Sequence, residues 1–134
     1  MKDDLLGPVV KGVDVVVILE DDTTNEYNVY LWNQREDILE GIIITSAGFG
    51  EDPLTRDEVK TATLRHSLEV LLPNEVAKIE SIIPDVFGLN NEFWVSFWVD
   101  EVLYDKQFLF TSHSITAKNF VYISQFGKNG MLAK

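Results

Sequence analysis

The fold of this chain is decided by residues 92–110, which read EFWVSFWVDEVLYDKQFLF. Successive side chains of a β-strand point to opposite faces, so Phe93 and Phe97 share one face while Trp94 and Trp98 share the other. An antiparallel strand with one solvated face needs only one apolar face. The second apolar face must therefore be covered by another layer of the chain, by a second copy of the chain, or by a partner.

A hairpin follows if Asp100 and Glu101 form a two-residue turn. This register pairs Val99 with Val102, Phe97 with Tyr104, Val95 with Lys106, Phe93 with Phe108 and, on the other face, Trp98 with Leu103. Neither Asp nor Glu relieves the positive φ that the tightest turns require, so a longer loop or a bulge is the alternative. A slip of one residue would exchange the two faces.

Alternating or β-branched runs predict further strands over residues 13–19, 26–33, 38–47, 59–71 and 120–125. The first two form a hairpin, Gly41 marks a bulge or a close backbone approach, and residues 48–53 form a loop. The segment 59–71 also follows a possible helix capping box at Thr55–Glu58, but its alternation favours a strand. Residues 127–130 are typical of a tight turn.

One helix is predicted from Pro73 to about Ile82, with Val76, Ile79 and Ile83 on one side and Pro84 as its stop. The expected architecture is therefore α+β. It consists of a mainly antiparallel sheet of about six or seven strands, curled or two-layered, with one short helix against it. Residues 1–134 are expected to form a single domain.

Composition limits the functions that are plausible. The chain has 134 residues, no cysteine and a net charge of −11, and its first 58 residues carry 14 acidic and 4 basic side chains. Such a charge opposes nucleic-acid binding, which depends on Lys and Arg. The apolar runs are too short to span a membrane, and the acidic start does not resemble a signal peptide, so a cytoplasmic location is expected. The charge asymmetry predicts complementarity within the fold or, alternatively, self-association.

Candidate catalytic groups are few. His66 alternates with Leu64 and Leu68 and is expected to be a partly buried, hydrogen-bonded residue, whereas Arg65 on the opposite face is the better candidate for clamping an anion. No Gly-x-Ser-x-Gly motif places a nucleophile. The acidic residues 20–26 supply oxygen ligands but lack the spacing of an EF-hand, so a solvated turn is favoured over a divalent-ion site. We expect no cofactor and no metal.

The runs Lys60–His66 and Asn91–Phe97 resemble an uncharacterised family of short acidic bacterial proteins over most of the chain. Some proteins of that family carry a phenylalanyl-tRNA synthetase label. Nothing in the sequence resembles the long class II catalytic domain, and an acidic domain is a poor tRNA binder. The resemblance therefore implies no activity and no site residues.

These observations favour a non-enzymatic protein that acts by protein association, as a homodimer or with another protein partner, and that binds neither nucleic acid nor membrane. The expected binding residues are Trp94, Trp98, Leu103, Arg65 and His66. The alternative is a small-molecule-binding domain or minor enzyme whose aromatic-lined pocket lies inside the curled sheet and is closed by Arg65 or His66.

Overall fold

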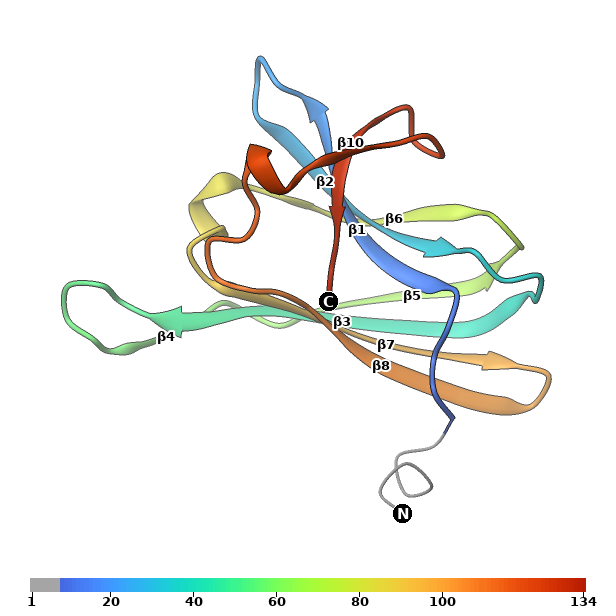
Figure 1. Cartoon of the computed structure of the whole chain (residues 1–134). Coiled ribbons are helices and arrows are strands. Elements are labelled where there is room, and N and C mark those ends of the chain that lie inside the picture. The colour runs from blue at the N-terminus through green and yellow to red at the C-terminus, as the bar shows by residue number, and fades with distance from the viewer. Residues whose placement is uncertain (1–7) are drawn as a thin grey trace.

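The computed structural model describes residues 8–134 as two antiparallel five-stranded sheets packed face to face (Figure 1). The first sheet has the order β6-β2-β1-β10-β9, and the second has the order β4-β3-β7-β8 with β5 also paired to β3. The strands are β1 (Val13–Asp21), β2 (Glu26–Asn33), β3 (Leu39–Glu51), β4 (Glu58–Lys60), β5 (Leu64–Leu71), β6 (Val76–Ile82), β7 (Asn90–Val99), β8 (Val102–Phe110), β9 (Val121–Ile123) and β10 (Lys128–Leu132). Two short 3₁₀ turns, η1 (Pro84–Val86) and η2 (Ala117–Asn119), complete the elements.

The main core lies between the sheets and takes side chains from both. Fully buried residues from the second sheet, such as Phe93, Phe97 and Phe108, belong to the same apolar cluster as Val15 and Leu31 of the first sheet. β1 is buried on its other face as well, where Val16 and Ile18 pack in a smaller cluster beneath Trp32 and Phe126. This second cover explains why residues 15–19 of β1 form a continuous apolar run rather than an alternating one.

The prediction of an α+β fold is wrong, because the segment expected to be a helix is the strand β6. Pro73 and Asn74 instead form the turn between β5 and β6, with Asn74 at φ 63° and the Glu75 amide donating to the Leu72 carbonyl over 3.0 Å. The pairing of β6 with β2 shifts at Ile79, which directs both Ile79 and Ile82 towards the core. This bulge gives the apolar residues a three-residue spacing, which the sequence pattern shares with a helix.

The hairpin of β7 and β8 has the predicted register, including Val99 opposite Val102 and Trp98 opposite Leu103. The β1–β2 hairpin is also confirmed. The predicted bulge at Gly41 is present, since the β3–β7 register shifts between Glu40 and Ile43 and Gly41 has a φ of 54°.

Two strands and one turn have boundaries that differ from the prediction. Residues 48–51 continue β3 rather than starting a loop, because Gly48 allows close packing against Asn91 of β7. The strand predicted over residues 59–71 is divided at residues 61–63 into β4 and β5, both of which pair with β3. The turn predicted at residues 127–130 lies at 124–127, and Gly130 is inside β10.

Candidate functional site

The outer face of the second sheet carries an apolar patch that the described residues leave open to solvent. We call Trp94, Trp98 and Leu103 the tryptophan face. Trp94 is 46% exposed, and Trp98 and Leu103 are each 44% exposed. Trp98 and Leu103 are direct cross-strand neighbours, and Trp94 lies on the same side of β7. Residues 8–134 therefore supply no layer that covers this face, which leaves a second copy of the chain or a partner as the expected cover.

Trp98 lies beside carboxylates. Glu40, Asp100 and Glu101 line a shallow depression with the Trp98 indole, and Glu40 is the cross-strand partner of Trp98. The indole also packs close to the bulge at Gly41, where an added Cβ would stand 3.2 Å from Trp98 Cδ1. The Trp98 end of the tryptophan face thus combines a half-exposed aromatic ring with three acidic side chains.

The turn that carries two of these acids has an unfavourable backbone conformation. Asp100 and Glu101 have φ values of 48° and 64°, in the left-handed region that favours Gly and Asn. The sequence already indicated that this pair suits a tight turn poorly. Residues in such conformations each cost on the order of 1 kcal/mol or more, and they gather at functional sites.

Arg65 lies on the same outer face, at the Trp94 end. Thr45 pairs with Arg65 on one side and with Trp94 on the other, so the two residues are two strands apart, roughly 10 Å between backbones. Within residues 8–134, Arg65 has no carboxylate at ion-pair distance. Arg65 therefore lies at the end of the tryptophan face opposite to Glu40, Asp100 and Glu101.

His66 is directed to the inner side of β5, as its alternation predicted. Its Nε2 atom lies 2.9 Å from Glu80 Oε1 on β6, across the edge where the two sheets come together. The same Glu80 oxygen accepts a hydrogen bond from Ser46 Oγ over 2.6 Å. Arg65 and His66 consequently belong to two different surfaces.

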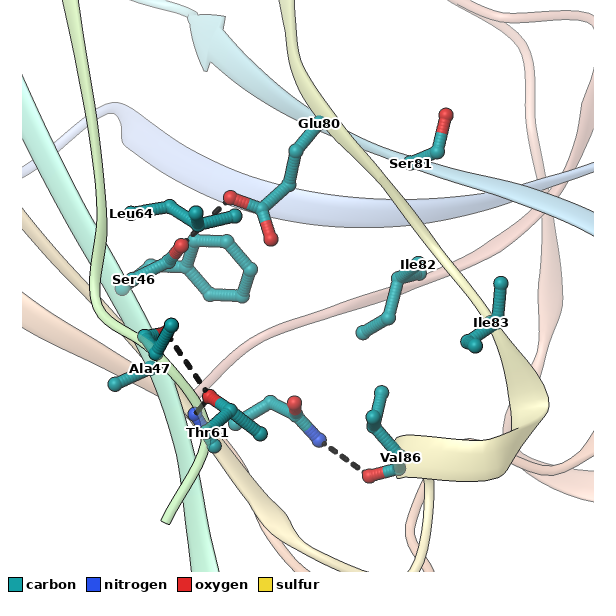
Figure 2. Close-up of a pocket in the computed structure, with 13 residues that line it drawn as sticks. Ser46, Ala47, Thr61, Leu64, Glu80, Ser81, Ile82, Ile83 and Val86 are labelled. Atoms are coloured by element: carbon teal, nitrogen blue, oxygen red, sulfur yellow. Dashed lines mark hydrogen bonds between the residues drawn. The ribbon is translucent and has the colours of Figure 1, made fainter.

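A pocket of about 380 Å³ lies beside this cluster, between β3 and β6 (Figure 2). Its walls are mainly apolar and are formed by residues that include Leu64, Ile82, Ile83, Val86 and Phe93. The volume falls near the lower end of the range for small-molecule sites, roughly 300–1,000 Å³. Phe93 is the one aromatic residue that lines this pocket, and neither Arg65 nor His66 lines it.

The Ser46–Glu80–His66 cluster differs from a hydrolase triad. In such a triad, histidine accepts the serine proton and the acid orients the histidine. Here Ser46 donates directly to Glu80, and His66 contacts the same carboxylate rather than the serine. The arrangement holds the Glu80 carboxylate in place and lacks the serine–histidine hydrogen bond of a triad.

The acidic residues near the β1–β2 turn are engaged within the fold. Glu20 accepts hydrogen bonds from Tyr30, Asn28 and Lys128, and Asp21 accepts from Thr23. Burial alone would raise the pKa of Glu20, but these hydrogen bonds outweigh it and hold the pKa below its usual value. Among residues 8–134, no set of three or more His, Asp or Glu side chains is arranged to hold a metal ion.

Tyr30 gives a direct test of this cluster. Burial, followed by the hydrogen bond to Glu20, raises the pKa of the Tyr30 hydroxyl to about 12. Because the pKa is raised on folding, the resulting stability is present below the unfolded value of about 10 and is lost as the pH rises through about 12. We expect an ultraviolet absorbance titration to show one late-ionising tyrosine. Tyr30→Phe should remove that component, and an unchanged late component would contradict the assignment.

No family model, curated protein or solved structure matches the chain. None of the helical segments in residues 8–134 has the length and apolar character needed to cross a membrane.

Sequence reasoning placed Trp94, Trp98 and Leu103 together, and the structure confirms that placement. It missed Glu80, because the segment containing Glu80 was predicted to be helical, and it missed Glu40 as a neighbour of Trp98. Only the predicted turn at Asp100 and Glu101 indicated that acids would lie next to the tryptophan face.

Proposed function

We propose that the protein acts by association, through its tryptophan face, with a partner protein that presents lysine or arginine side chains. The observation that carries the proposal is the half-exposed Trp98 indole next to Glu40, Asp100 and Glu101. An aromatic face attracts a cation through its quadrupole, and neighbouring carboxylates add charge-assisted hydrogen bonds. Trp is also among the residues that most often anchor protein interfaces.

The charges on this surface favour a basic partner over a second copy of the chain. Two more acidic residues, Glu92 on β7 and Asp105 on β8, point outward near the tryptophan face. The basic residue beside this face is Arg65 on β5. Two such faces packed together would bring five carboxylates from each copy into one interface with a single Arg65 from each copy, and the carboxylates left without a basic partner are destabilising there. Self-association remains a prediction of the sequence, and the experiments below distinguish the two partners.

The Trp98→Ala variant tests the proposal. With hexalysine as the probe at physiological ionic strength, we expect calorimetry to show affinity weakened about tenfold, since the cation loses its aromatic contact. The matched control is Tyr122→Ala on β9, a residue that is 67% exposed and lies outside the tryptophan face. Equal affinity of both variants and the original chain would show general attraction to an acidic protein and would contradict the proposal.

A second variant, Asp100→Asn with Glu101→Gly, separates binding from folding. Asn and Gly suit the positive φ values of this turn, so thermal unfolding should show a stability gain of about 1 kcal/mol. Loss of two carboxylates should at the same time weaken hexalysine binding. A variant that is more stable and binds equally well would remove the acids from the proposed site.

Sedimentation velocity at micromolar concentration addresses self-association. The proposal expects a monomer in the absence of a partner. A dimer that Trp98→Ala dissociates, while Tyr122→Ala does not, would assign the tryptophan face to a second copy of the chain instead.

A further inference from the structure

The pocket between the sheets lies at an edge where no backbone ladder joins them. β5 ends the second sheet and β6 ends the first, and their strand pairs run only to β3 and β2 respectively. The contact between the two edges includes the His66–Glu80 pair, and Ser46 of β3 also reaches Glu80. The mouth is bordered by Leu64 and Ile83, which are 47% and 56% exposed.

Among the side chains lining this pocket, Glu80 is the charged one. Most of the polar side chains in the wall have partners inside the protein: the Asn91 amide donates to the Val86 and Leu89 carbonyls, Ser81 donates to Asn28, and Thr61 accepts from the Gly48 amide. The Glu80 carboxylate is only 17% exposed and uses its Oε1 atom for both Ser46 and His66. Within residues 8–134, no hydrogen bond engages Glu80 Oε2.

The direction of this carboxylate is visible in Figure 2. One Glu80 oxygen is joined to Ser46, and the other points away from Ser46 and lies, in this view, between the side chains of Ser46 and Ile82. A carboxylate oxygen that faces an apolar pocket has lost part of its hydration, so a donor that reaches it from a bound molecule forms a strong, charge-assisted hydrogen bond. Ser46 and His66 act as positioning residues, because they fix the carboxylate through its other oxygen.

We propose that this pocket binds a small apolar molecule that carries a protonated amine, with the amine on Glu80 Oε2 and the apolar part against Ile82, Val86 and Phe93. The amine supplies both a hydrogen-bond donor and a positive charge for the Glu80 carboxylate. An ionised carboxylic acid of the same length is repelled by the negative charge of Glu80. The site is separate from the tryptophan face, since it lies between the sheets rather than on the outside of the second one.

The probe for this inference is n-hexylamine, with hexanoate as the charge control and methylamine as the control without an apolar chain. Backbone amide chemical shifts should report hexylamine binding at pocket residues such as Ser46, Gly48 and Phe93. Hexanoate and methylamine should bind about tenfold more weakly or not at all. Equal shifts from hexylamine and methylamine, or hexylamine shifts confined to other surfaces, would overturn the proposal.

The Glu80→Gln variant tests the proposed contact, because glutamine keeps an acceptor for Ser46 and His66 but removes the charge. We expect about tenfold weaker hexylamine binding. Glu69→Gln on the outward side of β5 is the matched control and should bind as the original chain does. If Glu80→Gln and Glu69→Gln bind hexylamine equally, the carboxylate has no role.

Val86→Phe provides an independent test that leaves Glu80 intact. Val86 is directed into the pocket in Figure 2, and the larger ring reduces the available volume. Hexylamine binding should fall while hexalysine binding at the tryptophan face stays the same. Unchanged hexylamine binding in a folded Val86→Phe variant would place the amine outside this pocket.

Discussion

Gly130→Ala should strongly destabilise the fold. An added Cβ at Gly130 would stand 2.5 Å from the Val17 carbonyl oxygen and 2.7 Å from Ile18 Cδ1, so relief requires the backbone of β1 or β10 to move. β10 lies between β1 and β9, which fixes it on both sides. Overpacking costs typically 1–3 kcal/mol and occasionally more. With a backbone atom in the way, we expect a loss above about 3 kcal/mol, out of a total stability of roughly 5–15 kcal/mol.

Circular dichroism and urea unfolding measure this effect, and Gly127→Ala is its matched control. Gly127 has a φ of 64°, but a Cβ there meets only the Tyr122 hydroxyl at 3.9 Å. We therefore expect Gly127→Ala to be destabilised by about 1 kcal/mol, from the positive φ alone and without a steric clash. If the two variants were equally destabilised, close packing against Val17 would not be the reason for glycine at position 130.

Asn33→Ala should give the second largest loss, about 2–4 kcal/mol, because it leaves one buried carbonyl group and two partly buried ones without the donor they have in the fold. Asn33 is completely buried at the end of β2, and its side-chain amide donates to the carbonyls of Asp37, Leu71 and Leu72 over 2.9, 3.2 and 3.1 Å. The side chain therefore joins the first sheet to the connection between β5 and β6.

Urea unfolding compares this variant with Asn119→Ala. Asn119 is exposed and donates one hydrogen bond, to the Ser114 carbonyl over 2.7 Å. Its loss should cost about 1 kcal/mol or less. A cost for Asn33→Ala as small as that of Asn119→Ala would show that water replaces the lost amide at the end of β2.

The β7–β8 hairpin could be predicted in detail from the sequence because two strands rich in apolar residues flank one adjacent pair of acidic residues. A change of register by one residue would exchange Phe93 and Phe97 for Trp94 and Trp98 in the core. Since both sets are apolar, the position of the two-residue turn at residues 100–101 decides the register. The bulge at Gly41 was predictable for a related reason, since an isolated glycine inside a strand pattern often marks one.

β6 could not be predicted, because its bulge depends on the partner strand. The extra residue at Ile79 is defined only by pairing with Val29 and Tyr30, more than 45 residues earlier in the chain. The pocket was hidden for the same reason. Ser46, His66 and Glu80 come from three strands, and nothing local in the sequence indicates that they meet.

The two long sides of this sandwich are held together differently. On the β8 side, the main chain crosses from one sheet to the other: the amide of Ala133 donates to the Val15 carbonyl, and Lys134 exchanges two hydrogen bonds with Leu109 at 2.9 and 3.0 Å. On the β5–β6 side, the polar contact at the pocket is made by the Glu80 carboxylate, and the turn after Leu72 joins the two strands at the other end. When the two sheets separate locally, we expect the separation to begin where Glu80 joins them, while the backbone hydrogen bonds of Lys134 keep the opposite side closed. Loss of the Glu80 contact should therefore loosen the two edge strands around the pocket while the Lys134 side stays joined, without unfolding of the whole molecule.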